Sequence, residues 1–108
     1  MEIDISDFQK MDLRVGEIEN CEKIKNSEKL VKLIVNIGEK KIQLVAGIAL
    51  SYKTEELIGK KIIVLANLKP KKIFGIESQG MLLAAHDKNN FPVLLTVDKD
   101  VEAGAKIS

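Results

Sequence analysis

The sequence predicts an all-β protein: a five-stranded OB-fold barrel with short helices and a C-terminal extension of extra strands. Five or six short apolar segments alternate with turn residues about every 8–15 positions, and only two short stretches favour helix. Gly16 interrupts the first apolar segment, and a strand that curls through a small barrel needs such a bend. The 108 residues, 12.0 kDa in mass, suit a single domain over residues 1–108.

The chain begins with a polar stretch that we predict to form a helical turn before the first strand. The turn covers Asp7–Met11, and the Ser6 hydroxyl is positioned to cap it by accepting from an unpaired amide. The first strand follows, because Leu13, Val15 and Ile18 are apolar among polar neighbours.

A β-hairpin is predicted next. Residues Leu30–Ile37 alternate between a uniformly apolar set and a mixed set, which indicates one buried face and one partly covered face. A turn at Gly38 to Lys40 leads into the third strand, Ile42–Ile48.

A short helix is expected at Tyr52–Ile58. Thr54 is its predicted cap, and Glu55 and Glu56 occupy the first turn, where the helix dipole favours negative charge. Gly59 ends the helix.

The remaining strands are predicted at Ile62–Ala66, Met81–Ala85, Phe91–Val97 and Lys106–Ile107. The first is continuously apolar and should be buried on both faces. Phe91–Val97 exceeds what a five-stranded barrel needs and would leave an unpaired edge. Pairing or packing of this segment and Ile107 across a two-fold axis would cover that edge, so we predict a homodimer.

Several classes of protein are excluded by what the chain lacks. No apolar run approaches the roughly 20 residues that cross a bilayer, so we expect no association with a membrane. The acidic first residues do not resemble a secretory signal, and a single cysteine fits a cytoplasmic location.

We expect no catalytic residues, no metal and no cofactor. His86 is the only histidine and has no ligand partner at metal-binding spacing. The glycines form neither of the common phosphate-cradling motifs. Cys21 lies between Glu19 and Glu22, whose carboxylates discourage a thiolate, so it should be inert.

The formal net charge of +1 conceals an uneven distribution. Residues 1–28 carry eight acids against four bases, residues 29–76 three against ten, and residues 77–108 five against three. The three parts therefore have net charges of −4, +7 and −2. A basic middle between acidic ends is typical of a phosphate-binding face, although a solvated lysine-rich surface would have the same composition.

The block Asn67–Ala85 gathers the basic residues into one place. Lys69, Lys71 and Lys72 surround Pro70, and turn-forming residues follow them before the next apolar run. Such a block presents cations and small polar groups between two strands, as expected of a surface that binds an anion. On an extended segment the three lysines cannot all face one way.

The same block resembles the signature of the tRNA-binding domain found at the C-terminus of methionyl-tRNA synthetases and in stand-alone tRNA-binding proteins. The matching pattern is N-L-K-P-x-K-x-x-G-x-x-S-x-G-M-x-L-A-A. Upstream, DF-x-K-x-D-L-R-V-G-x-I at Asp7–Ile18 and V-A-G-I at Val45–Ile48 are also similar to that family. The resemblance extends over nearly the whole chain in the right order, and it is strongest to the branch related to the methionyl-tRNA synthetase β-subunit.

The resemblance implies a non-catalytic module that binds tRNA by shape and backbone, with little sequence specificity and with methionyl-tRNA synthetase as a possible partner. The tRNA-binding residues it implies are Lys32, Asn67, Lys69, Lys71, Lys72, Ser78 and Met81. Two of them have a second interpretation, since Asn67 and Ser78 could instead bond to backbone within turns. Met81 is either a core residue or a soft platform for a base.

The chain departs from the family pattern in two places. Many members have a His-Pro pair where this chain has Ile24 to Ser27, and many have a basic residue where Phe74 stands. A secretion-chaperone-like branch, which binds peptides, has a similar fold and is the alternative function. That branch differs at Val45–Ile48, so we rank it second.

Overall fold

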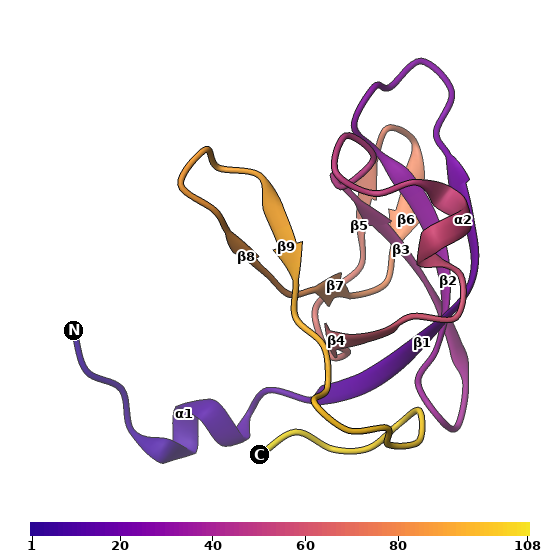
Figure 1. Cartoon of the computed structure of the whole chain (residues 1–108). Coiled ribbons are helices and arrows are strands. Elements are labelled where there is room, and N and C mark those ends of the chain that lie inside the picture. The colour runs from indigo at the N-terminus through magenta and orange to yellow at the C-terminus, as the bar shows by residue number, and fades with distance from the viewer.

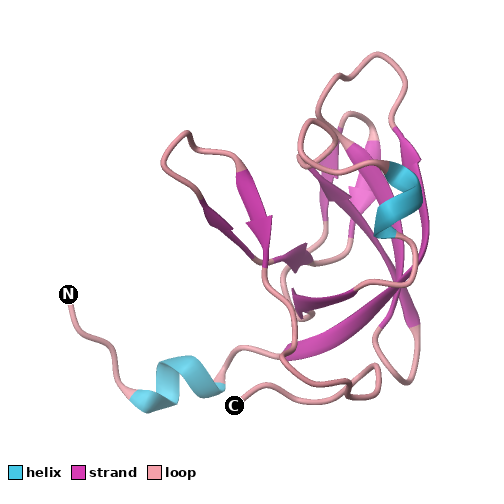
Figure 2. Cartoon of the chain, in the orientation of Figure 1, coloured by secondary structure: helices cyan, strands magenta, loops and turns pink.

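The computed structural model describes residues 1–108, and most of its regular structure is strand (Figure 2). The elements in chain order are α1 (Ile5–Gln9), β1 (Leu13–Lys23), β2 (Val31–Asn36), β3 (Lys41–Ala46), α2 (Thr54–Leu57), β4 (Lys61–Leu65), β5 (Lys71–Ile73), β6 (Ile76–Ser78), β7 (Met81–Leu82), β8 (Ala84–His86) and β9 (Pro92–Leu94). Neither helix has the length and apolar character needed to cross a membrane.

Five strands form a strongly curled antiparallel sheet in the order β3-β2-β1-β4-β7 (Figure 1). The long strand β1 belongs to both halves of this sheet: Leu13 to Glu17 pair with β4, and Glu17 to Lys23 pair with β2. The register shifts between Ile18 and Asn20, so the bulge that bends β1 lies at Glu19 and not at Gly16.

Gly16 has a packing role instead. A Cβ atom at this position would lie 2.5 Å from Cγ1 of Val35 and 3.2 Å from Cγ2 of Val64, both in the core of the barrel. The absence of a side chain therefore lets β1 pack closely against its neighbours.

Hydrogen bonds outside the regular strand ladder join β3 to the segment between β6 and β7 and nearly close the barrel. The Gln79 amide donates to the Gln43 carbonyl at 2.8 Å, and the Gln43 amide donates to Oε1 of Gln79 at 2.7 Å. The chain therefore has the predicted all-β architecture, an OB-like barrel with short helices and extra strands.

Two apolar clusters stabilise the structure. The larger fills the barrel and includes Ile62 and Val64 of β4. The smaller lies outside the barrel, where Leu13, Val15 and Ile63 are covered by the N-terminal Phe8 and by apolar residues of the C-terminal extension. Because successive residues of β4 face different clusters, the strand is buried on both faces, as predicted.

Both predicted helix caps are wrong by one or two residues. The N-caps are Asp4 for α1 and Lys53 for α2, so Ser6 and Thr54 lie inside the helices. In each case the carboxylate three residues after the cap accepts the cap's own N–H: Asp7 at 3.3 Å in α1 and Glu56 at 2.8 Å in α2. These acidic side chains, not hydroxyls, satisfy the exposed amides.

The second half of the chain departs further from the prediction. The β5–β6 hairpin was not expected. The predicted strand Met81–Ala85 is divided at Leu83, because β7 pairs with β4 whereas β8 pairs with β9. The predicted strand Lys106–Ile107 is reduced to one bridge between Arg14 and Lys106 and the bond from the Ile107 amide to the Leu13 carbonyl.

Candidate nucleic-acid interface

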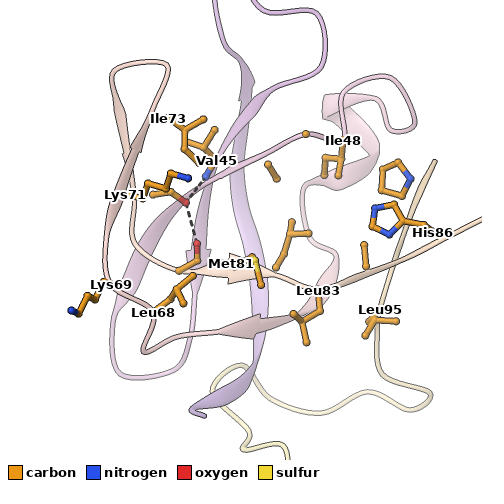
Figure 3. A pocket seen from close by; sticks show the side chains of 17 residues that line it. Val45, Ile48, Leu68, Lys69, Lys71, Ile73, Met81, Leu83, His86 and Leu95 are labelled. Atoms are coloured by element: carbon orange, nitrogen blue, oxygen red, sulfur yellow. Dashed lines mark hydrogen bonds between the residues drawn. The ribbon is translucent and has the colours of Figure 1, made fainter. Parts of the chain in front are cut away.

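An open groove of about 750 Å³ lies between the β5–β6 hairpin and the β8–β9 hairpin (Figure 3). The end of β3 and strand β7 form its middle, where Val45 and Met81 lie. Ten of its 17 lining residues are hydrophobic. Lys69 and Lys71 lie on one side of the groove and His86 on the other, so an apolar channel has a basic rim.

The structure brings Lys69, Lys71 and Lys72 together at the β5–β6 hairpin, and all three side chains are exposed. Lys69 and Lys71 line the groove. Lys72 pairs in register with Glu77 and lies on the opposite face of β5, as the alternation of an extended segment requires. We refer to these three residues as the lysine cluster.

The lysine cluster is free of ion pairs, unlike several other lysines of the chain. The lysines that contact carboxylates within 4.0 Å are Lys10, Lys32, Lys41 and Lys61. The ammonium groups of the lysine cluster have no such partner, so they are available to an anion from solution.

Lys32 lies close to the groove but is already neutralised. It pairs in register with Val45, which lines the groove, and its ammonium lies 2.6 Å from Oε1 of Glu22. A phosphate would therefore compete with this carboxylate for Lys32.

Ser78 has a structural role. It is only 5% exposed, and its hydroxyl accepts from the Val45 amide at 3.0 Å and donates to the Gly80 carbonyl at 3.1 Å (Figure 3). Ser78 lines the groove, but its hydroxyl is occupied by these two bonds and helps to hold β6 against β3.

Asn67 also bonds to backbone, though not within its own turn. Its amide group donates to the Lys10 carbonyl at 2.7 Å, and its side-chain oxygen accepts from the Asp12 amide at 2.9 Å. Asn67 thus fastens the segment after α1 to the end of β4.

Met81 is 47% exposed and lines the groove, so it is a surface residue and not a core residue. The other apolar residues of the groove, including Val45, Ile48, Leu83 and Leu95, were not expected in a site. They occur in apolar runs that are indistinguishable in sequence from core strands. The family motifs include Val45, Ile48 and Leu83, but no role in binding was predicted for these residues.

The profile of one protein family, described as "Putative tRNA binding domain", matches residues 13–106. The chain belongs to this family. The matched range includes the whole barrel, the lysine cluster and nearly all of the C-terminal extension.

Methionine–tRNA ligases are among the relatives of this tRNA-binding domain. The enzyme of Methanocaldococcus jannaschii is 54% identical over 106 residues, which are 98% of this chain and 16% of the relative. That of Thermotoga maritima is 55% identical over 106 residues, 98% of this chain and 17% of the relative. The chain thus spans about one sixth of the length of these relatives.

Solved structures of the same fold include a MetRS-related protein from Pyrococcus horikoshii, with a TM-score of 0.92, 44% identity and full coverage of both chains. The CsaA chaperone of Picrophilus torridus has a TM-score of 0.90 and 36% identity, and 99% of this chain and 100% of that chain are covered.

Cys21 and Arg14 of the tRNA-binding domain do not line the groove. Burial raises the pKa of the Cys21 thiol, and the charge of Glu22 raises it further. Both effects disfavour the thiolate, and burial, which the sequence did not indicate, is the larger of the two. Arg14 donates to Asp12 at 2.9 Å and lies 3.5 Å from Glu39; these contacts raise the pKa of Arg14. No three His, Cys, Asp or Glu side chains gather to hold a metal ion.

Proposed function

We propose that this chain is a non-catalytic tRNA-binding module in which the lysine cluster contacts the phosphate backbone. One observation carries the proposal: within a member of this family, Lys69, Lys71 and Lys72 are exposed, close together and unpaired with carboxylates. Each phosphate that they neutralise would release condensed counterions, which favours binding.

The same surface supports recognition by shape with little discrimination among tRNAs. The only arginine of the chain, Arg14, is already bonded to two carboxylates, so no free guanidinium can form paired bonds to a guanine edge. The exposed Met81 offers a polarisable surface for a ribose or base. Asn67 and Ser78 would support this surface from behind rather than contact RNA.

We also propose a role in methionine-specific tRNA charging, because the methionine–tRNA ligases contain a similar segment as a small part of their length. The module would increase the affinity of a methionyl-tRNA synthetase for tRNA, either within one protein or as an associated subunit in the cytoplasm. Residues 1–108 would act as one domain in either case.

A homodimer is part of the proposal. The β8–β9 hairpin extends from the barrel (Figure 1), and it carries the exposed apolar residues Phe91 and Val93, with Leu95 directly after it. Such a strip is suited to burial against a second copy. Two lysine clusters on one particle would bind one large RNA with greater avidity than a single cluster.

The proposed function is tested by titrating salt against tRNA affinity for Lys69→Ala, Lys71→Ala and Lys72→Ala, with Lys99→Ala as the control. Lys99 is exposed and unpaired like the cluster but lies in the C-terminal extension. We expect each cluster variant to weaken binding and to reduce the salt slope by roughly one unit, equally for methionine tRNA and an unrelated tRNA. The control should behave as the wild-type protein does.

Unchanged affinity in the three single variants and in the triple variant would contradict the proposal. A preference for methionine tRNA of more than about a hundredfold, or about 2.7 kcal/mol, would contradict the proposal that the protein recognises tRNA by shape.

A second candidate is peptide binding in the manner of the chaperones that share the fold. The observation in its favour is the mostly apolar groove of about 750 Å³. Binding of an unfolded segment through apolar contacts would not weaken with salt. The same titration with an unfolded polypeptide as ligand therefore separates the two functions.

A further inference from the structure

Phe74 occupies a conformation that its side chain does not favour. It forms a two-residue turn with Gly75 between the paired residues Ile73 and Ile76, and both turn residues have positive φ, +53° and +77°. This is the geometry of a type I′ hairpin turn, in which asparagine followed by glycine is preferred. A bulky residue at positive φ is strained, so a gain in backbone stability does not explain phenylalanine here.

Packing does not explain the residue either. The Phe74 side chain is 59% exposed and belongs to neither apolar cluster. The hairpin beneath it is well anchored, because Nε2 of Gln43 donates to the Glu77 carbonyl at 2.8 Å and Ser78 bonds to the Val45 amide. The fold therefore presents an aromatic ring to solvent on a fixed support.

The surroundings of the ring indicate what it contacts. Phe74 follows Lys71 and Lys72 within three residues, and no carboxylate occurs between Leu57 and Ile76. The turn lies at the end of the hairpin away from Lys69, beyond Ile73 at the edge of the groove (Figure 3). Across the hairpin the exposed Glu77 is opposite Lys72, but the two form no ion pair. An exposed ring on the hairpin that carries the lysine cluster suits a flat, apolar group attached to an anionic backbone, which describes an unpaired nucleotide.

The exposed apolar residues of the β8–β9 hairpin differ in this respect. Phe91, Val93 and Leu95 follow one another at alternate positions without an intervening charge. Their spacing on an extended segment is suited to a protein surface, whereas Phe74 is a single ring on the hairpin that carries the lysine cluster.

We propose that Phe74 stacks on an unpaired base of the RNA bound by the lysine cluster. The inference rests on the proposed function, and it adds a base contact to a site otherwise made of phosphate contacts. A phenyl ring stacks on any base, so the contact contributes affinity without sequence discrimination. The base comes either from the single-stranded 3′ end of tRNA or from one of its loops.

The test compares tRNA binding by Phe74→Ala, Phe74→Asn and Phe74→Trp with that of the wild-type protein. We expect about a tenfold loss of affinity in the first two variants, the typical effect of removing one stacked base, and retention of affinity in Phe74→Trp. Because no charge is removed, the salt slope should stay unchanged in all three. Phe74→Asn should also unfold at a higher urea concentration than the wild-type protein, because asparagine suits the turn.

Ile58→Ala is the matched control, since Ile58 is 51% exposed and distant in sequence from the lysine cluster. It should not change the affinity for tRNA. A blunt RNA duplex without unpaired bases should bind the wild-type protein and Phe74→Ala equally.

Phe74→Trp also gives a direct signal. The chain contains no tryptophan, so the new indole is its only such fluorophore. Stacking should quench its emission when tRNA binds. If trimming the single-stranded 3′ end of tRNA abolishes this quenching, the base comes from that end; quenching that persists assigns the base to a loop.

Wild-type affinity in Phe74→Ala and Phe74→Asn, while the lysine variants lose affinity, would overturn this inference and leave the proposed function intact. Absence of tRNA binding by the wild-type protein would instead overturn the proposed function itself.

Discussion

The Ser78 hydroxyl is a buried group in the wall of the groove, and its bonds hold that wall in place. It joins β6 to β3 through the Val45 amide and bonds the Gly80 carbonyl on the far side of a tight turn. At Gly80 a Cβ atom would lie 2.8 Å from the Leu65 carbonyl oxygen, so the chain passes close to β4 there. These contacts add to the bonds of Gln43 with Glu77 and Gln79, which also hold the β5–β6 hairpin and the lysine cluster in place.

Replacing Ser78 with alanine should lower the free energy of unfolding by about 1–3 kcal/mol, because the Val45 amide loses its partner inside the structure. Urea denaturation measures this change, with Ser51→Ala as a control whose hydroxyl makes no hydrogen bond to the rest of the chain. The folded variant should still bind tRNA. A large loss of affinity with unchanged stability would mean that Ser78 contacts RNA, as the family resemblance implied.

The C-terminal extension is attached to the barrel through both β1 and β4. Backbone bonds join Ala105 and Gly104 to Val15 of β1, and Lys61 of β4 makes three further bonds. Nζ of Lys61 donates to Asp100 at 2.9 Å and to the Val101 carbonyl, while its own carbonyl accepts from the Thr96 hydroxyl at 2.8 Å. These bonds hold the extension over the second apolar cluster, which would otherwise expose Ile63. The hydrogen bond from Lys61 lowers the pKa of Asp100, and the charge of Lys61 adds to the effect.

A lowered pKa means that the folded protein favours the Asp100 carboxylate over its protonated form. Its contribution to stability should therefore be complete above the ordinary pKa of an aspartate and disappear as the pH falls through the lower folded-state pKa. Asp100→Asn should be slightly less stable than the wild-type protein at neutral pH, since the carboxylate is exposed and screened. The difference in urea midpoint should vanish at low pH; a difference that is constant down to pH 2 would contradict the ion pair's contribution.

At the scale of the whole molecule, the lysine cluster and the exposed apolar strip lie on different hairpins. The lysine cluster is at the β5–β6 hairpin and the strip at the β8–β9 hairpin, with the groove between them. This separation would allow one hairpin to contact a second protomer while the other contacts RNA.

We expect sedimentation equilibrium at micromolar concentration to give twice the 12.0 kDa mass of one chain. Val93→Asp should shift the particle to a monomer, because a charge in the strip opposes its burial, and should weaken tRNA binding through lost avidity. Ile58→Asp adds the same charge outside the strip and should leave the mass unchanged. A wild-type mass near 12.0 kDa would exclude the dimer.

The sequence alone determined those features of the fold that depend on residues close together in the chain. Alternation over two segments and an intervening glycine turn predicted the β2–β3 hairpin, because burial of one sheet face imposes a period of two. The continuous apolar run Ile62–Ala66 predicted the strand buried on both faces. The family and the all-β fold likewise followed from motifs in the right order, and the lysine cluster was visible as a run of residues.

The tertiary structure decided what depends on residues distant along the chain. Ser78 accepts a hydrogen bond from an amide 33 residues away. Asn67 bonds backbone groups that are 55 and 57 residues away. No local pattern could therefore show that these side chains are already hydrogen-bonded within the fold. The β5–β6 hairpin was missed because strands of three residues are too short for periodicity to be recognised. Apolar residues likewise look the same in sequence whether they fill a core or line a groove. Which of the two they do is set by how the strands pack around them.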